Sequence, residues 1–93
     1  MNRENTYSFT PHARFFNFDE SSFIIDISDH NLYSLGKSSA LIAASLDGKT
    51  DMNGIIDIIR QYYRVSVEDG AGAVEKFFQM MLQKRLIEEV DLN

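Results

Sequence analysis

Apolar and polar positions divide the chain into a strand-like first part and a helical second part. The first part has three short runs rich in aromatic and β-branched residues, at residues 15–18, 23–27 and 32–35. Runs of this length and composition predict strands. The polar segments between them, 19–21 and 28–31, are short enough to be turns. The pattern therefore predicts an antiparallel meander that starts near Ala13, with its third strand, Asn31–Leu35, at an edge.

From residue 38 onward the apolar spacing becomes helical. The first helix is expected to begin with Ser38 or Ser39 as its N-cap, to run to about Leu46 and to end at Gly48. Thr50 is expected to cap the second helix. That helix has the clearest apolar period of the chain, formed by Met52, Ile55, Ile56, Ile59, Tyr62 and Tyr63.

A third helix is predicted after Ser66, which with Asp69 resembles a weak capping box. Its apolar stripe consists of Val74, Phe77, Phe78, Met81 and Leu82. Residues 86–90 suggest a last short strand. The predicted fold class is α+β, with three helices on one face of a small sheet and the last two helices forming a helix-turn-helix pair. The predicted organisation is a flexible tail over residues 1–12, one domain over 13–90 and a short tail over 91–93.

Composition and charge exclude several classes of function for this chain. The chain has 93 residues, 44% of them hydrophobic, which suits one folded domain. It has no cysteine, which excludes disulfides, thiolate metal sites and thiol catalysis. A net charge of -5 disfavours binding to nucleic-acid phosphates. No apolar run approaches the roughly 20 residues of a membrane span, and no signal peptide is recognisable. We therefore expect a cytoplasmic protein that binds neither nucleic acid nor membranes.

Three motifs resemble catalytic or metal-binding patterns, but their context argues against each. Residues 43–50 match a relaxed phosphate-loop pattern, yet a helical pattern precedes them where a buried parallel strand is required. Residues 28–30 have the residue types of a hydrolytic triad, but consecutive side chains cannot converge. His12 and His30 lack partners at metal-ligand spacing. We therefore expect no catalytic residues, no metal and no cofactor.

Two remaining features suggest peptide binding. The edge strand Asn31–Leu35 offers unpaired backbone groups to another strand. The third helix has an apolar arc wider than one core face needs, consisting of Ala73, Val74, Phe77, Phe78, Met80, Met81 and Leu82. Burial in an ordinary core remains the alternative for each of these residues. An open edge beside an apolar helix is the geometry of β-strand addition.

The order and spacing of several motifs resemble the PqqD-like family. These are the recognition elements that bind leader peptides of ribosomally made natural products. The matching positions are Leu35, Ser38, Ala40, Ile42, Asp47-Gly48, Ile55-Ile56, Tyr62-Tyr63, Val74, Phe77 and Leu86-Ile87. The similarity covers about residues 13–90, and Asn31–Leu35 looks most like free-standing members from lasso-peptide systems. The chain departs from the family pattern at Gly36, Lys37, Ala73 and Arg85, where Asn, Pro, Asp and Gly are usual.

The resemblance implies a winged helix-turn-helix-like fold with a three-stranded antiparallel sheet packed against three helices. It also implies a non-enzymatic function in which a leader peptide adds as a strand at the edge and rests on the third helix. The peptide-binding residues would be Asn31, Leu32, Tyr33, Ser34, Leu35, Val74, Lys76, Phe77, Phe78, Met81 and Lys84.

The partners implied by the resemblance are a precursor peptide and a separate maturation enzyme, either a leader peptidase or a radical-SAM enzyme. The chain itself is expected to be a monomer or a weak homodimer. The alternative is a winged-helix DNA-binding protein, which needs a basic recognition helix. The third helix carries Lys76, Lys84 and Arg85, but its start is acidic at Glu68 and Asp69.

Overall fold

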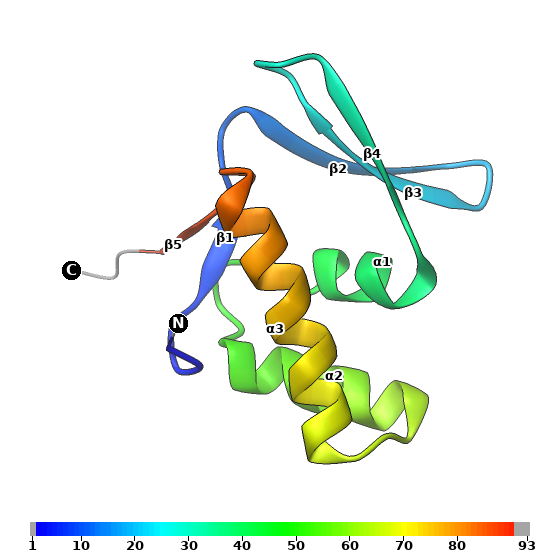
Figure 1. Cartoon of the computed structure of the whole chain (residues 1–93), viewed down its shortest axis with the longest axis vertical. Coiled ribbons are helices and arrows are strands. Elements are labelled where there is room, and N and C mark those ends of the chain that lie inside the picture. Colours follow the sequence, from blue (N-terminus) through cyan, green and yellow to red (C-terminus); the bar gives the residue numbers. More distant parts are fainter. Residues whose placement is uncertain (1, 91–93) are drawn as a thin grey trace.

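The computed structural model describes residues 2–90 and has a meander of three strands packed on three helices (Figure 1). The meander strands are β2 (Ala13–Phe18), β3 (Ser21–Asp26) and β4 (Asn31–Leu35). The helices are α1 (Lys37–Ala44), α2 (Met52–Tyr63) and α3 (Val67–Gln83). Two short strands, β1 (Tyr7–Phe9) and β5 (Ile87–Glu89), form a separate antiparallel pair. The α+β prediction and its order of elements are confirmed.

The meander has the strand order β2-β3-β4, so β4 lies at an edge as predicted. Ile24 in β3 pairs with Phe15 in β2 and with Tyr33 in β4. This row faces the helices, and Ile24 is fully buried. Asp19 and Glu20 both have positive φ, which matches the right-handed twist of a two-residue hairpin turn.

The hydrophobic core lies between the sheet and the helices. Its largest fully buried side chains are Phe78, Ile24, Ile42, Met52, Ile55, Met81, Leu86 and Val74. The helical period of α2 correctly marks its buried face at Met52, Ile55, Ile56 and Ile59. Helices α2 and α3 pack against each other across a short connection, which confirms the predicted helix-turn-helix pair.

The prediction of a flexible tail over residues 1–12 is wrong for residues 6–10. Tyr7 is only 3% exposed, and its ring meets Phe78 edge-on with centroids 4.9 Å apart. The N–H of Thr10 donates to the Leu86 carbonyl (3.0 Å). Burial raises the pKa of the Tyr7 phenol, and the Glu89 carboxylate adds to the effect. Strand β5 needs a backbone partner, and β1 supplies it from the other end of the chain.

Two of the predicted helix caps also need correction. Helix α1 starts at Lys37 after Gly36, and neither Ser38 nor Ser39 caps it. Helix α2 is capped by Asp51, whose carboxylate accepts from the Gly54 N–H (2.8 Å), and not by Thr50. A side-chain cap needs extended backbone at its own position, and sequence alone does not place that residue within a polar run. At α3 the predicted cap is correct, since Ser66 accepts from the Asp69 N–H (3.1 Å).

The segment resembling a phosphate loop is a turn built around Asp47. One carboxylate oxygen accepts from the N–H groups of Lys49 (2.8 Å) and Thr50 (2.7 Å). Helix α1 ends at Ala44, and Gly48 lies in the turn with φ 75° rather than at the helix end. The backbone donors that a phosphate would need are therefore already bound to a carboxylate.

This turn predicts an acid-dependent loss of stability that Asp47→Asn removes. The hydrogen bonds from Thr50 and Lys49 lower the pKa of the Asp47 carboxyl below its usual 3.8. A lowered folded-state pKa stabilises the protein above the unfolded value, and this contribution is lost as pH falls through the folded value. Urea unfolding should therefore show the variant less stable than wild type at neutral pH, with the difference shrinking in acid. A difference that stays constant with pH would contradict this account.

Candidate peptide-binding site

The outer edge of β4 carries backbone groups that no described strand pairs with. Just after β3, the Ile27 N–H donates to the carbonyl oxygen of His12, the residue before β2 (2.8 Å). Hydrogen-bonding direction alternates along antiparallel strands, so Ile24 bonds on the opposite side, to its register partner Tyr33. The neighbours of Tyr33 in β4, Leu32 and Ser34, therefore direct their N–H and C=O groups away from the sheet, toward the open edge. Within residues 2–90, β4 pairs with β3 alone.

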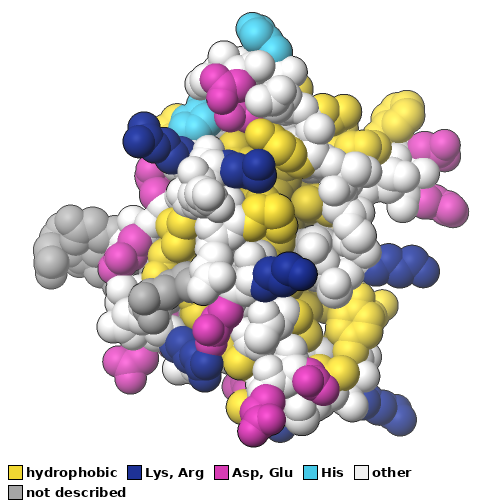
Figure 2. Space-filling model, in the orientation of Figure 1, with side chains coloured by type: hydrophobic (Ala, Val, Ile, Leu, Met, Phe, Trp, Pro, Cys, Tyr) yellow, Lys and Arg dark blue, Asp and Glu magenta, His cyan; other side chains and the backbone are white. Residues whose placement is uncertain are grey.

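A hollow of about 330 Å³ lies between the start of α1, the helix that follows β4, and the middle of α3. Its walls are formed by Ser38, Ser39, Ala73, Lys76, Phe77 and Met80. The four α3 residues follow helical spacing and so share one face of the helix. Only Gly36 separates β4 from α1, so Ser38 in the wall of the hollow lies three residues after the end of the edge strand. Figure 2 shows apolar side chains along the boundary between α3 and the sheet, with cationic side chains beside them.

A cation–π contact joins β4 to the carboxyl-terminal end of α3. The Lys84 ammonium lies 5.0 Å from the centroid of the Tyr33 ring. Lys76, two helical turns earlier, is exposed at the hollow. We call the surface formed by Leu32, Tyr33, Ser34, Lys84 and the hollow the β4–α3 groove. Its two lysines give it a positive character on a chain with net charge -5, which favours an acidic ligand.

The structure separates the predicted site residues into two groups. Asn31–Leu35 form the open edge, and Lys76, Phe77 and Lys84 border the groove. Val74, Phe77, Phe78 and Met81 are all at most 2% exposed and belong to the core. Of these four, Phe77 also lines the hollow, so the prediction that Val74, Phe78 and Met81 line the groove surface is wrong. The apolar arc of α3 has a core side and a groove side, and apolar periodicity does not distinguish them.

Sequence reasoning missed part of the groove. Ser38, Ser39, Ala73 and Met80 line the hollow but are absent from the predicted peptide-binding residues. Ala73 and Met80 belong to the apolar arc that the sequence indicated on the third helix, and they share one helical stripe with Lys76 and Phe77. No sequence signal marks Ser38 and Ser39, since their place beside α3 depends on how α1 packs.

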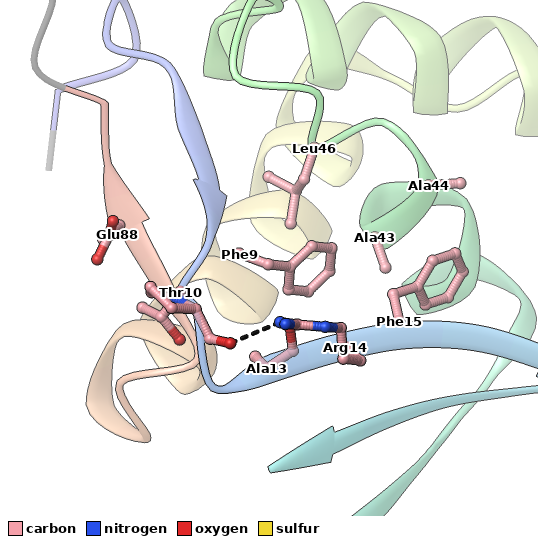
Figure 3. A pocket seen from close by; sticks show the side chains of 10 residues that line it. Phe9, Thr10, Ala13, Arg14, Phe15, Ala43, Ala44, Leu46 and Glu88 are labelled. Atoms are coloured by element: carbon pink, nitrogen blue, oxygen red, sulfur yellow. Dashed lines mark hydrogen bonds between the residues drawn. The ribbon is translucent and has the colours of Figure 1, made fainter. Parts of the chain in front are cut away.

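A larger hollow of about 570 Å³ lies near β2, at the opposite edge of the sheet (Figure 3). The rings of Phe9 and Phe15 stack there with centroids 6.2 Å apart. The Arg14 guanidinium, also in this hollow, donates to the carbonyls of Pro11 (2.6 Å) and Ala13 (2.9 Å). The chain's own backbone therefore engages this cation, and the other charged side chain in the lining of the hollow is Glu88.

Residues 2–90 contain no group of three His, Cys, Asp or Glu side chains able to hold a metal ion. The Nε2 atom of His12 lies 3.3 Å from the Thr10 hydroxyl. In the same range, no helix has both the length and the apolar character needed to cross a bilayer.

Comparison with known proteins defines the class. The family model described as "Coenzyme PQQ synthesis protein D (PqqD)" matches residues 21–87. The chain therefore belongs to the PqqD family, and the resemblance found in the sequence is confirmed. No curated protein matches the chain.

One solved structure has a similar fold, described as "TbiB1 in Complex with the TbiA(beta) Leader Peptide". The TM-score is 0.80 at 15% sequence identity, over 90% of this chain and 98% of that chain. At this identity the match concerns the fold, and it supports the winged helix-turn-helix-like arrangement of sheet and helices.

Proposed function

We propose that this protein binds the leader peptide of a ribosomally synthesised precursor and presents it to a separate maturation enzyme. The observation that carries the proposal is the open β4 edge, at Leu32 and Ser34, beside the hollow of α3. Family membership supports it. So does TbiB1, which shares the fold and was solved with a leader peptide.

The leader adds to the sheet as a fourth strand. Backbone groups of Leu32 and Ser34 hydrogen-bond to it, which gives affinity with little dependence on leader sequence. Side chains on the inward face of the leader enter the hollow beside Phe77 and Met80, which selects apolar residues there. Lys76 and Lys84 attract acidic residues, and exposed ion pairs of this kind contribute roughly 0–1 kcal/mol each. Backbone pairing and apolar burial therefore provide most of the affinity.

In this function the chain itself carries out no reaction. It supplies a recognition surface in the cytoplasm, and a leader peptidase or a radical-SAM enzyme modifies the precursor. Such a division of labour requires that the leader stay accessible while bound. A strand at the edge of a sheet has one side open to a second protein, which meets this requirement.

An NMR titration tests the proposal. Isotope-labelled protein is titrated with the leader half of the precursor encoded beside it, and duplex DNA serves as the control ligand. We expect saturable shifts concentrated in Asn31–Leu35 and in the groove residues of α3, and none with DNA. The absence of shifts with the leader, for folded protein, would sink the proposal. Shifts that follow DNA and disappear with added salt would favour the DNA-binding alternative.

A further inference from the structure

The face of the sheet that points away from the helices is mainly apolar. Strand register places Phe16, Phe18, Phe23, Ile25 and Leu32 there, together with Arg14, Ser21 and Ser34. Phe16 pairs with Phe23, with ring centroids 5.5 Å apart, and Ile25 pairs with Leu32. Ile27, just after β3, continues the same alternation. An antiparallel sheet with one solvated face normally has polar residues there. We call this surface the outer face.

The outer face is exposed within the described part of the chain. Phe18 is 70% exposed, Leu32 57%, Ile27 48% and Phe16 39%. Helix α1 packs against β3 and β4 from the other side of the sheet, where Ile24 is buried. Exposed apolar side chains gathered on one face mark an interaction site more often than scattered ones do. The outer face of the meander therefore presents mainly apolar side chains, and no described element covers it.

We propose that the outer face docks the maturation enzyme through an apolar, uncharged surface of that enzyme. This inference rests on the proposed function, since it assigns a second surface to the same delivery step. It requires one protein to hold the leader at the β4 edge and the enzyme on the outer face.

Continuity with the β4–α3 groove supports the enzyme as the occupant. Leu32 belongs to both surfaces, since its backbone faces the open edge and its side chain lies on the outer face. In a strand added beside β4, alternate side chains point the same way as Leu32. The bound leader would therefore widen the outer face. An enzyme seated there would contact the recognition protein and its own substrate together.

Area and charge argue against a second copy of this chain as the occupant. At roughly 200 Å² for a fully exposed large side chain, the four most exposed residues leave on the order of 400 Å² of apolar surface. A face-to-face pair would bury about twice that, well below the roughly 1,600 Å² of a standard stable interface. Two copies with a net charge of -5 each would also repel. An enzyme that contacts the leader as well gains the missing area.

The test is a double variant, Phe16→Thr with Phe18→Thr, which keeps strand propensity and removes two outer rings. The matched control is Tyr62→Ser, which removes an equally exposed ring (70%) from α2. Circular dichroism melting checks folding, and Phe18→Thr alone is the fallback if the double variant unfolds. Three quantities are measured: affinity for the leader, affinity for the maturation enzyme encoded beside the precursor, and self-association by sedimentation.

We expect the double variant to bind the leader as wild type does and to bind the enzyme at least about 10-fold more weakly, with the control unchanged. Unchanged enzyme affinity would overturn the inference. Wild-type self-association that the double variant abolishes would also overturn it, because a second copy would then cover the face. Failure of the proposed function is distinguishable, since it appears as absent leader binding in the wild type itself.

Discussion

Replacing Ser34 with proline is expected to weaken leader binding by about 5- to 150-fold while the protein stays folded. The Ser34 N–H points to the open edge, so proline removes a donor that the free protein does not use. The leader carbonyl facing this position then loses its partner, and an unsatisfied buried acceptor costs about 1–3 kcal/mol. Proline is tolerated on edge strands where the N–H faces solvent. Isothermal titration calorimetry with the leader, beside a thermal melt, measures both effects.

Two companion variants separate backbone loss from side-chain loss. Ser34→Thr keeps the N–H and changes only an exposed side chain, so leader affinity should stay near that of wild type. Tyr33→Pro removes an N–H that bonds to β3 and should destabilise the fold instead. If Ser34→Pro bound the leader as tightly as Ser34→Thr does, strand addition at this edge would be ruled out.

Replacing Phe78 with alanine is expected to cost about 3–5 kcal/mol of unfolding free energy. Phe78 is fully buried, and the centroid of its ring lies 4.9 Å from that of Tyr7 and 6.3 Å from that of Phe77. Truncation leaves a cavity where α3 meets β1, and a native core relaxes into such a space only partly. A domain of this size has about 5–15 kcal/mol of stability in total. The variant should therefore be marginally folded, as urea denaturation would show.

Met80→Ala is the matched control on the same helix. Met80 is 42% exposed at the groove, so its truncation should cost well under half as much stability. It should instead reduce leader affinity, because Met80 lines the hollow. Equal destabilisation by the two variants would mean that α3 does not separate a core side from a groove side as described.

Much of the fold was predictable because side-chain periodicity follows directly from backbone geometry. The apolar period of α2 predicts a helix that buries Ile55, Ile56 and Ile59, and the structure has it. The runs near Phe23 and Leu32 predict strands joined by short polar turns, which the register confirms. The family was recognisable because its motifs lie in this continuous stretch, where local spacing is preserved.

Other features depend on contacts between residues far apart in the chain. Tyr7 looks like part of a polar tail until β5 and Phe78 are placed beside it. Val74 and Met81 look like groove residues until the other helices cover them. Ser38 and Ser39 resemble helix caps in the sequence, and only the packing of α1 against α3 shows that they line the hollow.

The sequence by itself determined the order of the elements from β2 onward, the edge position of Asn31–Leu35 and membership of the PqqD family. Only the tertiary structure decided which side of α3 is core, that β1 completes the fold, and that the outer face of the sheet is left apolar and open. The physical reason is that periodicity reports which residues share a face, since it arises from one element's own geometry. What covers that face depends on the packing of distant elements.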